Sequence, residues 1–296
     1  MVRRSKGSII PSTLALAIIL SFVVYLLVLI FTSQNVEGIY PLQLLNYYQK
    51  GFWDLLAFAM QMMLILVLGN VLALTPIFQK LIRVILSKIN NGTIAILLTA
   101  IFSLLLSYFN WGLGLIFSAL LARSIAERAR QASMSLNYPL LVAAAYSGMM
   151  VWHGGLSGSA PLTVAESNHF LTGLMGVIPV SETIFSSMNI TLYAAFLVLI
   201  PSTFLLLSRI KANNFTDQLD LPEAAPILPS QSRRQYLGFA LGIVIAFISV
   251  YQFYLYGLSA LNINLINFIL LSLGLILYAN IEQFMKAVTS AISSSN

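Results

Sequence analysis

The amino-acid sequence predicts an all-α fold, a polytopic transmembrane helix bundle that contains a re-entrant hairpin and a broken helix. Three observations predict it. Apolar residues make up 59% and charged residues 8% of the chain, whereas about a quarter of the residues in a globular domain are charged. The apolar residues form runs near the ~20 residues that cross a bilayer. Basic residues gather in alternate connections, and two glycine-rich stretches interrupt the apolar pattern.

The first half of the chain predicts two spans, an interfacial helix and a hairpin. Residues 11–32 are longer than the apolar core of a signal peptide, so we expect a retained span. A second span is expected at 52–74. At 77–89, apolar and basic residues alternate at helical spacing, which predicts a helix lying in the membrane interface. Residues 92–109 and 113–126 are each short for a crossing and favour a re-entrant hairpin, although two full spans remain open.

A broken helix and a long span are expected next. Residues 138–152 predict a span that continues as an interrupted stretch to residue 180. The long apolar run at 184–208 predicts another crossing. We expect Ser181 to cap this helix and Glu182 to lie in its first turn, where a carboxylate is favoured. A proton-coupling role of Glu182 is the alternative.

The last part of the chain predicts a loop and further helices. Acidic residues, basic residues and three prolines at 209–235 predict a solvated loop. Spans are expected at 236–256 and 261–280, and the start of another helix at 281–296. The sequence thus divides into a first transmembrane unit at 1–208, a cytoplasmic loop at 209–235 and a second, incomplete unit at 236–296. The positive-inside rule places these parts in the cytoplasm: the N-terminus, 77–90, 123–137, 209–235 and the C-terminus.

Two helix breaks contain the candidate binding residues. The first is Asn-Trp-Gly-Leu-Gly at 110–114, and the second is the Gly-, Ser- and Pro-rich stretch at 153–161. Unwound backbone at membrane depth is tolerated where it is buried or lines a cavity, and secondary transporters bind substrates and coupling ions at such breaks. Close helix packing through small residues is the alternative. The predicted substrate-binding residues are Asn110, Gly112, Gly114, Gly154, Gly155, Ser157, Gly158 and Ser159.

Other function classes find little support. The chain has no cysteine, which excludes disulfides and thiolate metal sites, and the metal ligands, if any, are unknown. Its net charge of +6 is spread over connections and does not form the single patch of a nucleic-acid-binding protein. The Gly-Leu-Ser-Gly sequence at 155–158 is similar to the serine turn of intramembrane proteases, but His153 and His169 lie too close to it in sequence to supply the base. We therefore expect no enzymatic activity.

Four segments resemble bacterial short-chain fatty acid transporters, the group proposed to take up acetoacetate and butyrate. They are Gly51 to Met62, Asn110 to Leu115 with Ala122-Arg123, Tyr138 to Leu141 leading to 154–162, and Ile178 to Val180 leading to Asn189-Ile190. The segments follow family order over roughly residues 45 to 290. The resemblance implies an ion-transporter-like fold with two inverted repeats, each with a hairpin and a broken helix.

Two departures from the family pattern affect this interpretation. His153 stands where family members tend to have a third glycine after the tryptophan. Family members are also about half as long again and carry a second glycine-rich break, so the chain resembles the family without its C-terminal part. A second chain that supplies the missing repeat, or a homo-oligomer, is therefore a possible partner.

The resulting hypothesis is a multi-pass secondary transporter in the bacterial inner membrane, with a cytoplasmic N-terminus. It takes up short-chain fatty acids or similar small monocarboxylates, uses no cofactor beyond a coupling Na⁺ or H⁺, and contacts the lipid bilayer but no nucleic acid. The alternative is a truncated, non-transporting membrane subunit that pairs with another chain.

Overall fold

The computed structural model describes residues 13–32, 39–209 and 236–294, and every regular element in these ranges is a helix. The basic residues before position 13 and nearly all of the loop predicted at 209–235 lie outside the described residues. The chain forms two compact units, Met1–Ala59 and Met60–Asn296. The division predicted at 209–235 stays a prediction.

Helix α3 begins in the first unit and continues into the second. Short 3₁₀ turns at Ser147–Met150, Trp152–Gly154 and Gly257–Ala260 connect some of the helices. The helices are α1 (Thr13–Phe31), α2 (Tyr40–Asp54), α3 (Leu56–Ala73), α4 (Pro76–Lys88), α5 (Gly92–Phe109), α6 (Trp111–Gln131), α7 (Tyr138–Tyr146), α8 (Ser159–Val164), α9 (Thr172–Met175), α10 (Ser187–Leu207), α11 (Tyr236–Tyr256), α12 (Ile263–Tyr278) and α13 (Ile281–Ser294).

The first unit contains a helix that the sequence interpretation missed. No helix was predicted between the spans at 11–32 and 52–74, but the 15-residue helix α2 begins at Tyr40, and the predicted span at 52–74 is divided at Leu55. Pro41 lies in the first turn of α2, where backbone N–H groups have no partner within the helix, so the missing N–H of proline costs no hydrogen bond. Within the unit, the Tyr25 hydroxyl donates to the carbonyl oxygen of Pro41 at 3.2 Å, so α1 and α2 pack together.

Apolar helices of spanning length confirm the predicted membrane bundle. Among the described residues, four helical stretches are long and apolar enough to cross a membrane: Tyr40–Ala73, Gly92–Phe109, Ser187–Leu207 and Tyr236–Ala260. The shorter apolar helices Ala15–Phe31 and Ile263–Tyr278 add to these. The chain is therefore an all-α, multi-pass membrane protein.

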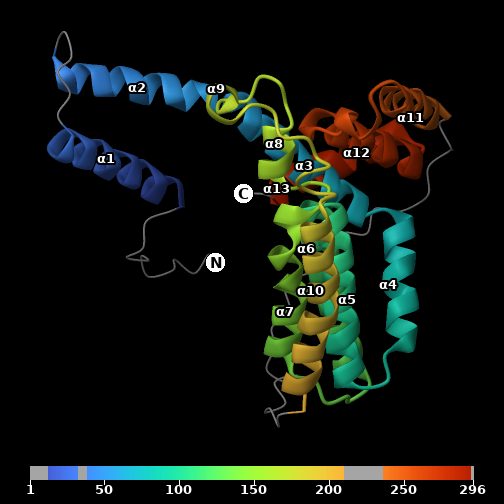
Figure 1. The fold of residues 1–296 in the computed structure, drawn as a ribbon. Coiled ribbons are helices and arrows are strands. Elements are labelled where there is room, and N and C mark those ends of the chain that lie inside the picture. The colour runs from blue at the N-terminus through green and yellow to red at the C-terminus, as the bar shows by residue number, and fades with distance from the viewer. Residues whose placement is uncertain (1–12, 33–38, 210–235, 295–296) are drawn as a thin grey trace, which may run out of the picture. The chain divides into compact units, whose positions relative to one another are not determined.

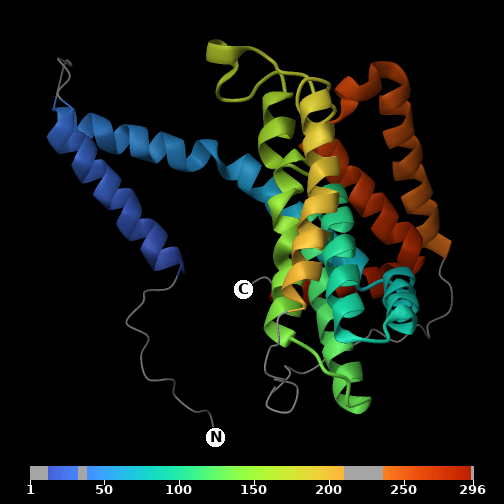
Figure 2. The same cartoon turned by 60° about the horizontal axis from the view of Figure 1, so that its bottom comes forward.

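Helix α5 forms the centre of the second unit. It contacts α6, α7 and α10, and these four helices run side by side in Figure 1 and Figure 2. Leu104 of α5 packs with Val151 and with Ile200 of α10 in a buried apolar cluster. Helices α5 and α6 make the predicted helical hairpin, with Asn110 between them. The depth of this hairpin in a bilayer stays a prediction.

Helix α4 matches the amphipathic helix predicted at 77–89, but part of its apolar face meets protein. Ile82 and Ile85 are buried, and Phe78 lies edge-on to Phe117 of α6 with ring centroids 5.9 Å apart. Ile77 is exposed. The apolar face therefore contacts α6, and the interfacial position of the helix stays a prediction.

Two predicted helix ends are wrong. The span expected at 138–152 is α-helical only to Tyr146 and continues as 3₁₀ turns, the first of which includes Gly148, whose N–H bonds to Ser103 Oγ at 3.0 Å. The span expected to begin at 184 begins at Ser187. Ser186, not Ser181, caps it, and its hydroxyl accepts a hydrogen bond from the Asn189 N–H at 3.2 Å.

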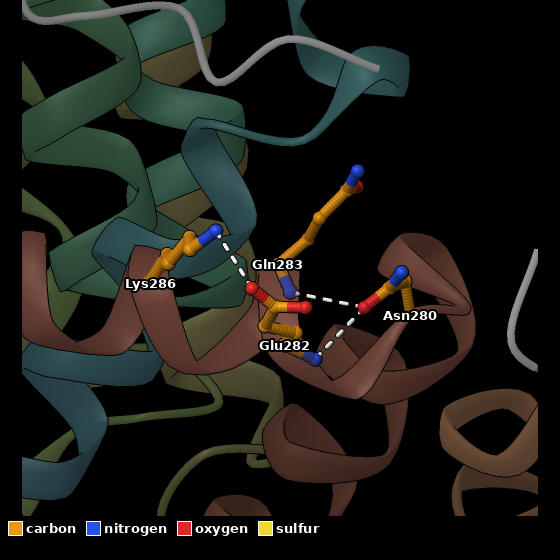
Figure 3. Close-up of polar contacts among 4 residues, drawn as sticks. All are labelled: Asn280, Glu282, Gln283 and Lys286. Atoms are coloured by element: carbon orange, nitrogen blue, oxygen red, sulfur yellow. Dashed lines mark hydrogen bonds and ion pairs between the residues drawn. The ribbon is translucent and has the colours of Figure 1, made fainter. Parts of the chain in front are cut away.

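The predicted C-terminal helix is confirmed as α13. Ala279 adopts a left-handed conformation at the turn after α12. The side-chain oxygen of Asn280 then accepts hydrogen bonds from the N–H groups of Glu282 and Gln283, and Glu282 forms an ion pair with Lys286 at 2.9 Å (Figure 3). The ion pair is exposed, so the Asn280 cap defines the start of the helix more than the charges do.

Candidate functional site

The first break is a single fully buried residue, Asn110. Its extended backbone (φ −152°, ψ 122°) ends α5, and its N–H bonds back to the Leu106 carbonyl at 2.8 Å. Its side-chain Oδ1 accepts the Leu113 N–H at 2.7 Å and so caps α6. Asn110 therefore terminates one helix and starts the next without exposing backbone groups.

The second break, at 153–161, contacts the first directly. In the structure the α-helix stops at Tyr146 before this break and resumes within it at Ser159. The Ser157 hydroxyl oxygen accepts the Trp111 N–H at 3.0 Å, and the Leu156 N–H donates to the Tyr108 carbonyl at 2.7 Å. Ser157 is fully buried. The two breaks, which were predicted separately, thus form one junction between the hairpin and the broken helix.

The glycines of this junction allow backbones to approach closely. A Cβ atom on Gly112 would lie 3.0 Å from Cα of Leu66 in α3, and one on Gly114 would collide with Ser107 of α5. A Cβ atom on Gly155 would collide with the carbonyl of Tyr108. Close helix packing, the alternative stated above, accounts for these three glycines. A role in lining a substrate site stays a prediction.

The other predicted residues lie along the second break. The carbonyl of Gly154 accepts a hydrogen bond from Asn189 Nδ2 of α10 at 2.9 Å. Gly158 is extended and buried, and Ser159 is partly buried at the first position of α8. The structure therefore brings the first-break residues together with Gly155 and Ser157, while Gly154 contacts α10 and Ser159 begins the next helix.

Several polar side-chain atoms at the junction are buried without a hydrogen-bond partner. They are Asn110 Nδ2, Trp111 Nε1 and Ser107 Oγ. A buried donor that lacks a partner destabilises the fold by about 1–3 kcal/mol, so we expect these groups to bind a polar ligand or water in the functioning protein. Two of the three are donors only, which suits an anion. Sequence reasoning missed Ser107, although Thr99, Ser103, Ser107 and Asn110 recur at helical spacing.

An apolar pocket of about 230 Å³ adjoins the junction. Its lining includes Phe109 and Leu156, which immediately precede Asn110 and Ser157 in the sequence. Phe185, Phe253 of α11 and Ile266 of α12 contribute to the other walls. Polar donors and an apolar hollow therefore occur at neighbouring positions of the same two breaks.

Sequence reasoning also missed Glu166, which follows α8. It is the only Asp, Glu, Lys or Arg between Arg130 and Glu182, and this isolation was a usable signal. Its Oε1 atom is buried without a partner. Within the described residues, no group of three or more His, Cys, Asp or Glu side chains could hold a metal ion.

Broken helices with unwound backbone inside a membrane bundle are a feature by which many transporters bind their substrates. The chain belongs to the short chain fatty acid transporter family, which it matches over residues 1–296. It is 30% identical over 97% of its length to an *Escherichia coli* (strain K12) protein provisionally named a short-chain fatty acid transporter, of which it covers 65%.

A *Haemophilus influenzae* (strain ATCC 51907 / DSM 11121 / KW20 / Rd) protein with the same provisional name is also 30% identical over 97% of this chain, which covers 66% of it. The chain thus spans about two thirds of the length of these curated relatives. No solved structure shows a significant match.

Proposed function

We propose that the protein takes up short-chain fatty acids or similar small monocarboxylates across the bacterial inner membrane, driven by a proton or sodium gradient. The junction of the two breaks supports this most directly, because it combines unpaired buried donors with an adjoining apolar pocket. A carboxylate requires donors, and a short alkyl chain requires apolar surroundings. The pocket of about 230 Å³ is smaller than the ~300–1,000 Å³ of typical drug-sized sites.

The charge of the two breaks supports a substrate with one negative charge. Neither 110–114 nor 153–161 contains a lysine or arginine. A di- or tricarboxylate would leave a second charge without a cationic partner, which is costly in a buried site. The apolar lining of the pocket also disfavours acids with further polar groups, because those groups would find no hydrogen-bond partner there.

The proposal is tested by reconstituting the purified protein in liposomes. We expect saturable uptake of labelled butyrate that depends on an imposed pH or sodium gradient and is inhibited by other short monocarboxylates but not by succinate. Two further preparations, one with the *E. coli* relative alone and one with both proteins, test the alternative of a non-transporting subunit. Uptake by the protein alone would rule that alternative out. No uptake by the protein alone, and no change when it is added to the relative, would contradict the transporter proposal.

The variant Asn110→Asp tests the site itself. Aspartate is as good an N-cap as asparagine, so α6 keeps its cap while the Nδ2 donor is lost. A hydrogen bond to a charged group contributes about 1.5–3 kcal/mol, so the apparent affinity for butyrate should fall about 10- to 150-fold.

The matched control is Asn91→Asp. Asn91 caps α5 in the same way, by accepting the Ile94 N–H at 2.9 Å, and is exposed. It should leave uptake unchanged. An unchanged KM in Asn110→Asp would remove Asn110 from the site.

A further inference from the structure

Glu166 lies where the broken helix meets α12. It follows α8 by two residues, and its N–H bonds to the Thr163 carbonyl at 3.1 Å. Its carboxyl group accepts a hydrogen bond from the N–H of Ile263, the first residue of α12. The same short α8 begins at Ser159, directly after Gly158, so Glu166 is connected to the second break by one helix of six residues.

The surroundings of Glu166 contain little charge. His169 is the titratable group that acts on it. The His169 ring accepts the Leu171 N–H at Nδ1 (3.2 Å), and its Nε2 lies 2.8 Å from the Gly176 carbonyl oxygen. Among the elements packed here, α8 and α9 have no titratable side chain, the preceding 3₁₀ turn has His153, and α12 has only Tyr278 at its far end.

Other described carboxylates differ from Glu166. Glu127 and Glu282 pair with Arg123 and Lys286 at 2.9 Å, whereas Asp54 and Glu182 are exposed. Glu166 is partly buried and its Oε1 has no partner. The partly buried Glu166 carboxyl group therefore has one oxygen hydrogen-bonded to the Ile263 N–H and one oxygen without a partner.

A proton suits this carboxyl group better than a metal cation does. The Ile263 N–H already occupies one side of the carboxyl group, and the N-terminal end of α12 carries partial positive charge. A metal ion would therefore find a single free oxygen here, and among the described residues no group of three His, Cys, Asp or Glu side chains could complete its coordination. A proton, in contrast, can bind to the unpaired Oε1 and give a neutral acid, which tolerates burial.

We propose that Glu166 carries the coupling proton of the transporter, an inference that rests on the function proposed above. A proton from the acidic side binds Oε1 and converts the carboxylate to the neutral acid. The neutral acid binds the α12 N-terminus less tightly, so the segment after the broken helix is freed to move. The proton leaves Oε1 on the other side of the membrane. One proton accompanies one monovalent carboxylate, so the cycle is electroneutral.

The test compares two transport modes of reconstituted Glu166→Gln. We expect the wild-type protein to accumulate labelled butyrate in response to a pH gradient faster than protein-free liposomes, which take it up by permeation of the neutral acid, and without further response to a membrane potential. Glu166→Gln should lose this protein-dependent uptake and match protein-free liposomes, yet should still exchange labelled for unlabelled butyrate faster than they do. Glu182→Gln, an exposed carboxylate nearby, should behave like the wild type.

Glu166→Asp provides a second measurement if the glutamine variant does not fold. It keeps a titratable group at a different depth, so the pH of half-maximal uptake should shift. Accumulation by Glu166→Gln faster than in protein-free liposomes, an unchanged pH profile in Glu166→Asp, or wild-type accumulation driven by sodium alone would each overturn the inference. Wild-type protein that neither accumulates nor exchanges butyrate faster than protein-free liposomes would overturn the proposed function as well.

Discussion

At the scale of single residues, Ser157 and Asn110 both form hydrogen bonds to backbone groups at the breaks. Asn110 closes α5 and opens α6, and Ser157 accepts the N–H of Trp111 from a different part of the chain. Both residues are fully buried. Their first role is to satisfy backbone groups at the breaks, and substrate contact would come in addition to it.

Replacing Ser157 with alanine should therefore destabilise the junction. The Trp111 N–H would lose its acceptor in a buried setting, which costs about 1–3 kcal/mol. We expect a lower midpoint in denaturant-induced unfolding of the detergent-solubilised protein. The matched variant Ser159→Ala, at a partly buried position two residues on, should change the midpoint less. Equal stability of Ser157→Ala and the wild type would show that this hydrogen bond is not formed in the native protein.

At the scale of elements, α10 holds the second break in place. Asn189 Nδ2 donates to the carbonyls of Gly154 (2.9 Å) and Ile184 (2.7 Å). One turn further along, the ring of Tyr193 stacks on that of Tyr108 with centroids 4.0 Å apart. These contacts link the start of α10 to both α5 and the break.

The variant Asn189→Asp should loosen the break. A carboxylate cannot donate to the two carbonyl oxygens, and it repels them. The loss of these bonds should open the segment 153–158 more often, because local opening depends on the bonds that hold a segment closed. Faster amide hydrogen exchange at 153–158 is the expected readout. Asn168→Asp, in an exposed part of the following loop, serves as the control and should leave this exchange unchanged.

The sequence predicted the elements whose signal is local. Long apolar runs indicated α3, α5, α10, α11 and α12 without any tertiary information. Helix α2 was missed because its proline and polar residues resemble a loop, and proline fits a first helical turn equally well.

The end of α7 was misplaced, since no local signal shows that the chain continues there as a 3₁₀ turn whose Gly148 bonds to Ser103, 45 residues earlier. For the candidate site, too, only the local features were predicted from the sequence. Glycine and serine content marked both breaks, but only the fold shows that Trp111 and Ser157 meet. Ser107 and Glu166 each had a local signal, helical spacing for one and isolation from other charges for the other, but their burial and unpaired atoms are tertiary properties that only the fold shows.

At the scale of the whole molecule, basic residues predict how the chain is inserted in the membrane. Lys80, Arg83 and Lys88 lie on α4, and Arg123, Arg128 and Arg130 lie in the second half of α6. In the hairpin, these two basic regions flank α5 and the first half of α6. The hairpin thus begins and ends on one side, whatever its depth.

A reporter that is active only in the cytoplasm tests this topology. We expect activity for fusions near positions 85, 130 and 220 and none near positions 40 and 258, because basic connections stay in the cytoplasm. Fusions near 85 and 130 should both be active or both be inactive, whether 92–126 is a re-entrant hairpin or two full spans. Activity at 40 or 258 would reverse the proposed orientation.

The pairing of α3 with α12 has a consequence for how the protein is made. Asn267 Nδ2 donates to the Gln61 carbonyl at 3.0 Å, and the Tyr278 hydroxyl donates to the Val71 carbonyl at 3.1 Å, across 206 and 207 residues of chain. At a translation rate of ~5–20 residues per second, α12 is synthesised roughly 10–40 s after α3. During that interval the nascent α3 must be accommodated by lipid, by the hairpin or by the insertion machinery. The ribosome thus completes most of the bundle before α3 meets its final neighbour.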